Sequence, residues 1–255
     1  MEYVNWHLHF LGVGDAHASS LGASAAVLER NSEPLLLIDC GPGTLDRYLA
    51  TYGTSPKAVF LTHAHFDHVG DMELLFARLW FGDRVRAGTR VFIHAALLPW
   101  LQGRVADYPG VAAEGGVSFW EPFQLLPCTR GFWLDGYWFD VFASRHHMPG
   151  TSFGLSLDGC FAYTGDTRPI PEALQARAAH GELIAHDCGL SGNPSHTGID
   201  DLAGEYPEEL RSRLLLYHYA SAADGAAMAE RGYRVAHPLE RIALPAAAAV
   251  RPDAG

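Results

Sequence analysis

One stretch, residues 59–71, constrains this chain more than any other. It begins with Val59-Phe60-Leu61, a β-branched and aromatic run that predicts a buried strand. Three imidazoles and a carboxylate follow within a few residues: His63, His65, Asp67 and His68. At the end of a buried strand these groups are costly to desolvate unless a charged partner binds them. Because neutral imidazole and carboxylate are ligands for zinc and similar ions, the stretch predicts a metal site rather than a solvated histidine-rich loop.

Size and charge narrow the classes of protein that fit. With 255 residues, of which 48% are apolar, the chain can form one large core, and we expect a single domain over 1–245 with a disordered tail at 246–255. A net charge of −11 without any run of Lys and Arg argues against an extended nucleic-acid surface. No secretory segment and no membrane-spanning run is visible, so we expect a cytoplasmic protein that does not bind membranes.

Strands and helices alternate along both halves of the chain, which predicts an α/β fold, and polar groups repeatedly fall at strand ends. Beyond the first motif, these are one of His146 or His147, then Asp166 and His218. Five imidazoles and two carboxylates suit two metal ions that share a water. Asp39, at the end of another buried strand, is suited to a hydrogen bond with a metal-bound histidine. The Gly- and Pro-rich region 103–131 predicts an irregular lobe.

The order of these motifs resembles that of the metallo-β-lactamase superfamily over nearly the whole chain. The resemblance rests on residues 62–68, supported in order by 37–41, His147, 164–167 and 217–219. It implies an αββα sandwich with two divalent metal ions at its edge, Zn²⁺ first and Mn²⁺ or iron as alternatives. It assigns one metal to His63, His65 and His147, the other to Asp67, His68 and His218, and the bridging position to Asp166; Asp67 is also predicted to be catalytic.

The choice between His146 and His147 depends on spacing. Neighbouring residues on a strand point to opposite faces, so only one of the two is expected to face the metal. Relatives place this ligand shortly before a Phe-Gly or Tyr-Gly pair, which is Phe153-Gly154 here. His147 lies closer to the usual separation, and we therefore predict His147, with His146 as the alternative.

Within the superfamily the chain resembles the tRNase Z and phosphodiesterase branch. The matching segments include Phe10 to Gly14, Ala185 to Cys188 and Ser195 to Thr197. This resemblance implies that His196 is a proton donor oriented by Asp187, although the family acid is usually Glu. The alternative is that His196 caps a helix or lies in solvent.

The segment between His147 and Asp166 bears on the substrate. Long-form bacterial tRNase Z relatives insert a tRNA-gripping arm there, whereas this chain has only residues 148–165. The resemblance therefore points to small phosphodiesters, as in the cyclic-nucleotide phosphodiesterases, cyclic-phosphate phosphodiesterases and phage anti-Pycsar enzymes of this branch. We predict a hydrolase that uses a metal-bridging hydroxide as its nucleophile, and the resemblance also admits a homodimer.

Three other functions stay open at this point. One is a tRNase Z-like ribonuclease. Another is a metallo-hydrolase of a lactone, thioester or β-lactam, whose leaving groups need little acid assistance and would leave Asp187 and His196 without a clear task. The third is a non-catalytic or iron-dependent redox member of the superfamily.

Overall fold

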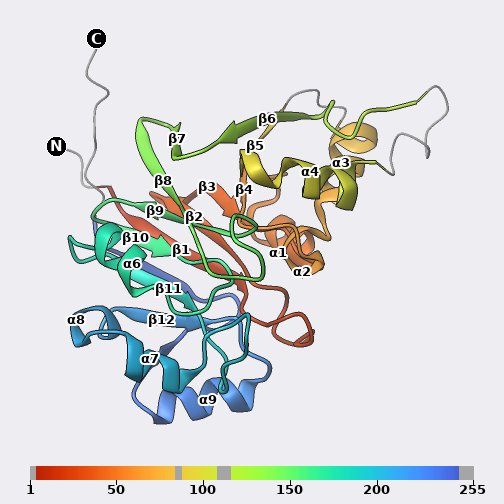
Figure 1. The fold of residues 1–255 in the computed structure, drawn as a ribbon. Coiled ribbons are helices and arrows are strands. Elements are labelled where there is room, and N and C mark those ends of the chain that lie inside the picture. The colour runs from red at the N-terminus through yellow and green to blue at the C-terminus, as the bar shows by residue number, and fades with distance from the viewer. Residues whose placement is uncertain (1–3, 84–87, 108–115, 247–255) are drawn as a thin grey trace.

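The N-terminal half of the chain and one strand from the C-terminal end build a seven-stranded sheet in the computed structural model, which describes residues 4–83, 88–107 and 116–246 (Figure 1). The strands lie in the order β14-β1-β2-β3-β4-β5-β6. Strands β3 to β6 run parallel to one another, so their carboxyl ends meet at one edge of the sheet. The bounds are β1 Trp6–Gly12, β2 Ala25–Arg30, β3 Glu33–Ile38, β4 Ala58–Leu61, β5 Thr89–His94, β6 Phe123–Cys128 and β14 Arg241–Leu244.

The second sheet also has seven strands, in the order β13-β12-β11-β10-β9-β8-β7. Strands β7 to β10 form an antiparallel meander, and strands β10 to β13 run parallel to one another. The parallel strands again deliver their carboxyl ends, followed by Asp166, Asp187 and His218, to one edge. The bounds are β7 Gly131–Leu134, β8 Tyr137–Ala143, β9 Phe153–Leu157, β10 Phe161–Tyr163, β11 Leu183–Asp187, β12 Leu214–Tyr217 and β13 Arg234–Val235.

Aromatic side chains fill the space between the two sheets. Phe132 on β7 stacks on Phe92 of β5 with ring centroids 3.9 Å apart, and it also contacts Phe60 of β4 at 5.9 Å. Nearer the other end, Phe10 of β1 contacts Tyr217 of β12 at 5.9 Å. These rings are buried, and burying them contributes roughly 1.5–3 kcal/mol each to holding the sheets face to face.

Helices cover the outer faces of both sheets, which confirms the predicted αββα sandwich (Figure 1). The first sheet is flanked by α1 Thr44–Tyr52, α2 Phe66–Val69, α3 Met72–Ala77 and α4 Leu98–Leu101, with a 3-10 turn η2 Ala95–Leu97 and π-helical segments η1 Arg78–Asp83 and η3 Gln102–Ala106. The second is flanked by α6 Pro171–Arg177, α7 Ile199–Glu205, α8 Glu208–Arg211 and α9 Ala222–Glu230.

Two regions were predicted to lack regular structure: the lobe at 103–131 and the tail at 246–255. Region 103–131 is more regular than predicted, because its described part contains η3 and the strand β6, which pairs in parallel with β5. The predicted tail lies, apart from Ala246, outside the described residues.

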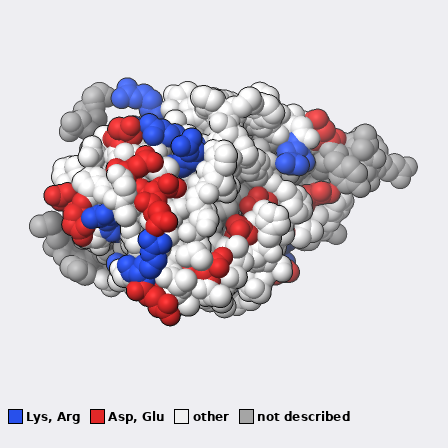
Figure 2. All heavy atoms as spheres, turned by 60° about the horizontal axis from the view of Figure 1, so that its bottom comes forward, with Lys and Arg blue, Asp and Glu red and all other residues white. Residues whose placement is uncertain are grey.

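No helix in the described part of the chain is long and apolar enough to cross a membrane. On the face drawn in Figure 2, Lys and Arg are interspersed with Asp and Glu rather than joined in a continuous basic band.

Candidate active site

The edge where the parallel strands of both sheets end gathers the predicted metal-binding residues. His63 follows β4, and its backbone pairs with Ser152, just before β9 of the other sheet. A short helix, α2, begins three residues later at Phe66 and carries Asp67 and His68 on adjacent positions. The motif therefore spans the seam between the two sheets, and residues from the second sheet can approach it directly.

Four side chains form the first group that could hold a metal ion: His63, His65, His146 and Asp166. His63 Nε2 lies 3.6 Å from Asp166 Oδ2, and His146 Nε2 lies 3.8 Å from the same oxygen. His65 Nδ1 is 3.1 Å from His146 Nε2. Three imidazole nitrogens and one carboxylate oxygen within such distances match the donor set that zinc and similar ions take in enzymes.

A second group shares Asp166 with the first and adds Asp67, His68 and His218. His68 Nε2 is 3.2 Å from Asp166 Oδ1, and His218 Nε2 is 3.3 Å from Asp166 Oδ2. His218 Nε2 also lies 3.6 Å from Asp67 Oδ2. Because both oxygens of Asp166 face imidazole nitrogens, its carboxylate has the position from which it could bridge two metal ions.

Several polar atoms of these two groups are buried without a hydrogen-bond partner. They are His63 Nε2, His68 Nε2, His218 Nε2 and Asp166 Oδ1. Leaving a buried donor or acceptor unsatisfied costs about 1–3 kcal/mol per group, so such atoms are rare unless a ligand serves them. Four of them converging on one space therefore fit a site for positively charged metal ions.

The protonation states of two ligands agree with this interpretation. Burial lowers the pKa of His63 well below its usual value and lowers the pKa of His146 to about 4. Both rings are consequently neutral at pH 7, which is the form in which imidazole binds a metal ion.

Asp39 has the supporting role predicted for it. Its Oδ2 accepts hydrogen bonds from His68 Nδ1 and from the Thr62 hydroxyl, both at 2.8 Å, and its Oδ1 accepts one from the Thr62 backbone N–H at 2.8 Å. The pairing of β3 with β4 makes this contact, because it places the ends of the two strands side by side. Holding Nδ1 in this way leaves His68 Nε2 free to face Asp166.

Three residues at this edge have a left-handed backbone. Asp39, His147 and His218 have φ values of 62°, 53° and 68°, in the left-handed region that non-glycine residues rarely adopt. Each such residue costs on the order of 1–3 kcal/mol and persists where surrounding structure enforces it, often at functional sites.

The positions of the two neighbouring histidines favour His146, the alternative, over the predicted His147. His146 is 2% exposed, and its ring contacts those of His63 and His65 at 5.0 and 4.8 Å. His147 is exposed, and its Nδ1 lies 3.3 Å from Ser195 Oγ instead of facing Asp166. The left-handed backbone of His147 turns the chain at this residue, and spacing measured to Phe153 does not reveal such a turn.

His196 lies beside both groups, as predicted, and pairs with Asp187. His196 Nδ1 donates to Asp187 Oδ2 at 2.8 Å and is 4.0 Å from Asp166 Oδ2. Its ring stacks on His218 at 5.0 Å. Helix α7 begins after Gly198, so His196 does not cap it. Burial alone lowers the pKa of His196, but the hydrogen bond and charge of Asp187 outweigh it and hold that pKa above its usual value.

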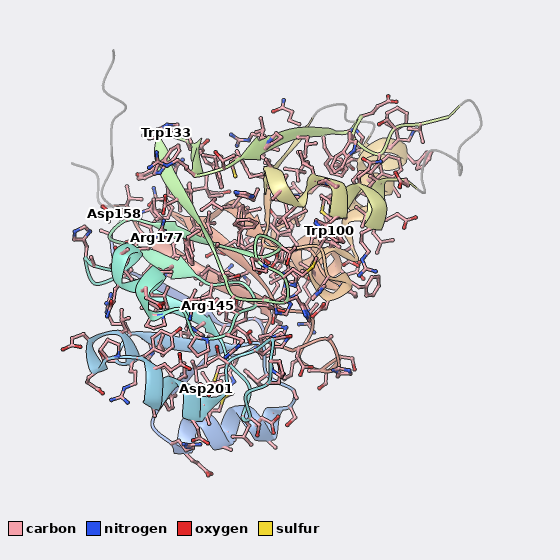
Figure 3. The ribbon with its side chains drawn as sticks, in the orientation of Figure 1. Trp100, Trp133, Arg145, Asp158, Arg177 and Asp201 are labelled. Carbon is pink, nitrogen blue, oxygen red and sulfur yellow. The ribbon has the colours of Figure 1, made fainter. Side chains whose placement is uncertain are left out.

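Two residues near the first group carry no motif and were not singled out in the sequence. Trp100 and Arg104 line a cavity together with His63, His65 and His146. Trp100 comes from α4 (Figure 3). Arg104 comes from η3, at the start of the region 103–131 that the sequence predicted to be irregular. A tryptophan and an arginine four positions apart are common on helical surfaces, so only the three-dimensional arrangement relates them to the site.

The comparisons with known proteins agree with this site. The family model described as Anti-Pycsar protein Apyc1 matches residues 6–238. The chain belongs to this family. An Apyc1 protein of Paenibacillus harenae is 28% identical over 229 residues, covering 86% of this chain and 91% of that protein. The ribonuclease Z of Mycobacterium marinum is 27% identical over 239 residues, covering 87% of this chain and 80% of that protein.

The fold of this Apyc1-family chain is shared with solved structures. YhfI from Bacillus subtilis, a metallo-β-lactamase fold protein, superposes with a TM-score of 0.70 at 14% identity, covering 94% of this chain and 99% of YhfI. The resemblance to the metallo-β-lactamase superfamily and its tRNase Z-like branch is thereby confirmed. The chain is a metal-dependent hydrolase.

Proposed function

We propose that this chain hydrolyses a small phosphodiester, such as a cyclic nucleotide, at a centre of two divalent metal ions, with Zn²⁺ as the first choice. The ligands we propose are His63, His65 and His146 for one ion, Asp67, His68 and His218 for the other, and Asp166 as the bridge. The observation that carries the proposal is the contact of His196 with Asp187, 2.8 Å long, at the rim of both metal-binding groups.

A phosphodiester needs a proton donor such as His196 more than an ester with a good leaving group does. Its leaving alkoxide has a high pKa and departs readily only if it is protonated as the bond breaks. Two bound metal ions would supply the rest of the chemistry by lowering the pKa of a shared water to give a bridging hydroxide, and by neutralising charge on the phosphate.

The chain's own residues then have separate tasks. Asp187 is fully buried and accepts hydrogen bonds from His196 and from the backbone N–H of Thr167, so its carboxylate is fixed in place. It raises the pKa of His196 above its usual value, which favours the protonated ring, and it holds the Nδ1–H, which leaves Nε2–H for transfer to the leaving group. Asp39 fixes His68 in the same way on the opposite side.

A small substrate is favoured over a long nucleic acid. Between His146 and Asp166 the chain contains β9, β10 and their short connections, and nothing that would extend as an arm. The face in Figure 2 has no continuous basic band along which a polynucleotide backbone would lie. Ribonuclease Z relatives keep a tRNase Z-like ribonuclease as the second candidate, which a structured tRNA precursor would test directly.

The decisive experiment is a hydrolysis assay on metal-depleted protein reloaded with Zn²⁺ or Mn²⁺. Bis-p-nitrophenyl phosphate reports phosphodiesterase chemistry, and a panel of 3′,5′- and 2′,3′-cyclic monophosphates, short RNA and precursor tRNA reports the substrate class. We expect cleavage of the chromogenic diester and of at least one cyclic nucleotide. Protein that holds two metal ions and cleaves none of these phosphodiesters would refute the proposal.

Lactones, thioesters and β-lactams belong in the same assay because the fold also suits them. Hydrolysis of one of these that is unchanged in a His196→Ala variant, with no phosphodiesterase activity, would assign the chain to that class instead. Metal analysis by mass spectrometry on the same samples identifies the ions and their number. Two irons without hydrolysis would point to oxygen chemistry.

A further inference from the structure

Two cavities of different character meet at the metal-binding groups. The first has a volume of about 470 Å³ and the second about 540 Å³, and both include His65 and His147 in their walls. Among the described residues, the wall of the first contains Arg104 and no Asp or Glu. The wall of the second contains Asp15 and Asp224, besides the carboxylates of the metal-binding groups, and no Lys or Arg. An anionic substrate is therefore attracted from the first side and repelled from the far wall of the second.

The first cavity also has an apolar wall made of residues from separate segments. Trp100 on α4 is 52% exposed, and Met148, in the loop after β8, is 56% exposed. Leu97 and Pro99 line the same space. Exposed large apolar side chains that border a site mark a surface that binds something apolar. A flat ring and a polarisable thioether are well suited to contact a planar aromatic group.

Arg104 is anchored in a way that leaves most of its guanidinium free. Its Nε donates to the carbonyl oxygen of Ala64 at 3.2 Å, and Ala64 lies between His63 and His65. Among the described residues Arg104 forms no ion pair with a carboxylate. The terminal nitrogens can therefore bind an anion, and the bond to Ala64 holds them beside the residues we propose as ligands.

Contacts on both sides fix the segment that carries these residues. The Trp120 indole N–H donates to Gln102 Oε1 at 2.8 Å, and Leu101, between Trp100 and Gln102, is fully buried. At the start of the segment, His94 stacks on Phe153 with ring centroids 3.7 Å apart, and its Nδ1 accepts the backbone N–H of Ala96. The apolar wall is thus attached to β9, whose preceding residue Ser152 pairs with His63.

We propose that this first cavity is the base subsite of the phosphodiesterase: Trp100 stacks on the nucleobase opposite Met148, and Arg104 binds a non-bridging oxygen of the scissile phosphate. This inference rests on the proposed function and adds the orientation in which the substrate lies in the site. The base occupies the first cavity, the phosphate lies over His65 and His147, and the leaving oxygen points to the second cavity, whose wall contains His196. The donor then approaches the leaving ring oxygen from the side of the second cavity, while the base lies in the first.

The test compares 3′,5′-cyclic nucleotides with ribose 3′,5′-cyclic phosphate, which has the same phosphate ring and no base. For the base-bearing substrates we expect Trp100→Ala to raise KM about 10-fold with little change in kcat, because stacking on an aromatic ring is lost. The base-free analogue should show no change. Trp100→Phe should restore most of the loss, and Trp100→Leu, which is apolar without a π-face, should not.

Substitution of Arg104 should affect both substrates, unlike substitution of Trp100, because Arg104 is proposed to contact the cyclic phosphate that the two substrates share. Arg104→Gln should raise KM for both substrates alike, by about 10-fold, and Arg104→Lys should recover part of that loss. Matched controls are Trp133→Ala, on the exposed hairpin strand β7 far from α4 (Figure 3), and Arg234→Gln, on β13; both should match the wild type.

The outcomes separate this inference from the function on which it rests. Wild-type protein that holds its metal ions and cleaves no phosphodiester, bis-p-nitrophenyl phosphate included, refutes the proposed function. Cleavage of that diester without cleavage of any cyclic nucleotide refutes the base subsite alone. Cleavage of cyclic nucleotides that Trp100→Ala leaves unchanged, or that it weakens equally for the base-free analogue, refutes the base subsite alone. Equal rescue by leucine and phenylalanine would exclude stacking on a planar base.

Discussion

Two buried clusters of histidine and carboxylate in the described part of the chain differ, because the one around Asp166 has the features of a metal site and the other does not. The second cluster is Glu29 on β2 with His9, Tyr52 and Arg241. The Glu29 side chain is 1% exposed and accepts hydrogen bonds from the Tyr52 hydroxyl at 2.6 Å and from Arg241 Nε at 3.1 Å. His9 Nδ1 is 2.8 Å from the same hydroxyl. Among the described residues, no buried polar side-chain atom of this cluster lacks a partner, in contrast to the cluster around Asp166.

The position of each cluster in its sheet explains the difference. His9 lies opposite Arg241 on β14 in an antiparallel pair, and β1 pairs with β2 on its other side, so adjacent strands bring three of these residues together and Tyr52 at the end of α1 supplies the remaining partner. The side chains around Asp166 lie at or just beyond the ends of parallel strands from two sheets, and several of their polar atoms have no hydrogen-bond partner there. Burial of His with Asp or Glu therefore does not identify a metal site, whereas several unpartnered imidazole and carboxylate atoms that converge on one space indicate one.

The largest expected effect comes from removing the residue shared by both metal-binding groups. Asp166→Ala should lose both metal ions and reduce hydrolysis to background, because each group loses one of its anionic oxygens and the bridge between them. Metal content by mass spectrometry and kcat for bis-p-nitrophenyl phosphate measure this. A variant that retained two metal ions would contradict the bridging role, and Asp158→Ala, on an exposed turn, is the control.

The two neighbouring histidines give the next largest effect and a direct contrast. His146→Ala should lose one metal ion and roughly 10³-fold in kcat, since a metal ion contributes several kcal/mol to the transition state. His147→Ala should keep both ions and most of kcat. The opposite pattern would restore the choice that spacing in the sequence favours.

Much of the site could be predicted because its information is local. His63, His65, Asp67 and His68 lie within one turn after a strand, so their convergence needs no knowledge of the rest of the fold. Asp166 and His218 were found because each directly follows a strand that the apolar pattern reveals. Asp39 followed from the same reasoning, since a carboxylate at the end of a buried strand requires a partner.

The remaining parts depend on geometry that local sequence does not encode. His146 and His147 are chemically identical, and a left-handed φ of 53° at His147 decides between them. Strand β6 is interrupted by Pro127 and half-exposed, so its residues do not show the apolar run of a buried strand. The cavity wall of Trp100 and Met148 joins segments that are distant in the chain, and no pattern within either segment indicates the other.

Loss of the proton donor should have a smaller effect that depends on the leaving group. His196→Ala should keep both metal ions and reduce kcat about 100-fold for a cyclic nucleotide, whose leaving alkoxide needs a proton. For bis-p-nitrophenyl phosphate, with its acidic leaving phenol, the reduction should be under about 10-fold. Equal losses for both substrates would mean that His196 acts on binding or structure instead of on proton transfer.

Metal removal should destabilise the protein, because buried atoms of the cluster around Asp166 are then left without partners. A ligand at about 1,000 times its Kd adds about 4 kcal/mol to the free energy of unfolding, which for a chain of this size shifts Tm by on the order of 10 °C. Treatment with a chelator should lower Tm by that amount in the wild type and leave Tm of Asp166→Ala unchanged. A wild type whose Tm ignores both chelator and added Zn²⁺ would show that the cluster does not bind metal tightly.

The smallest effect belongs to the cluster whose atoms are all paired. Glu29→Gln should leave metal content and kcat unchanged and lower the free energy of unfolding by about 1–3 kcal/mol at pH 7, because hydrogen bonds to a buried charge are weakened. Burial alone would raise the pKa of Glu29, but its bonds with His9 and Tyr52 and the charge of Arg241 outweigh this and hold it below 4.5. A carboxylate with a lowered pKa stabilises the fold at neutral pH, and this contribution disappears as pH falls below its folded-state pKa. Denaturant unfolding from pH 7 to pH 3 should therefore show the difference between wild type and variant shrinking in acid; a difference that stays constant would mean that the carboxylate's charge is not what stabilises this cluster.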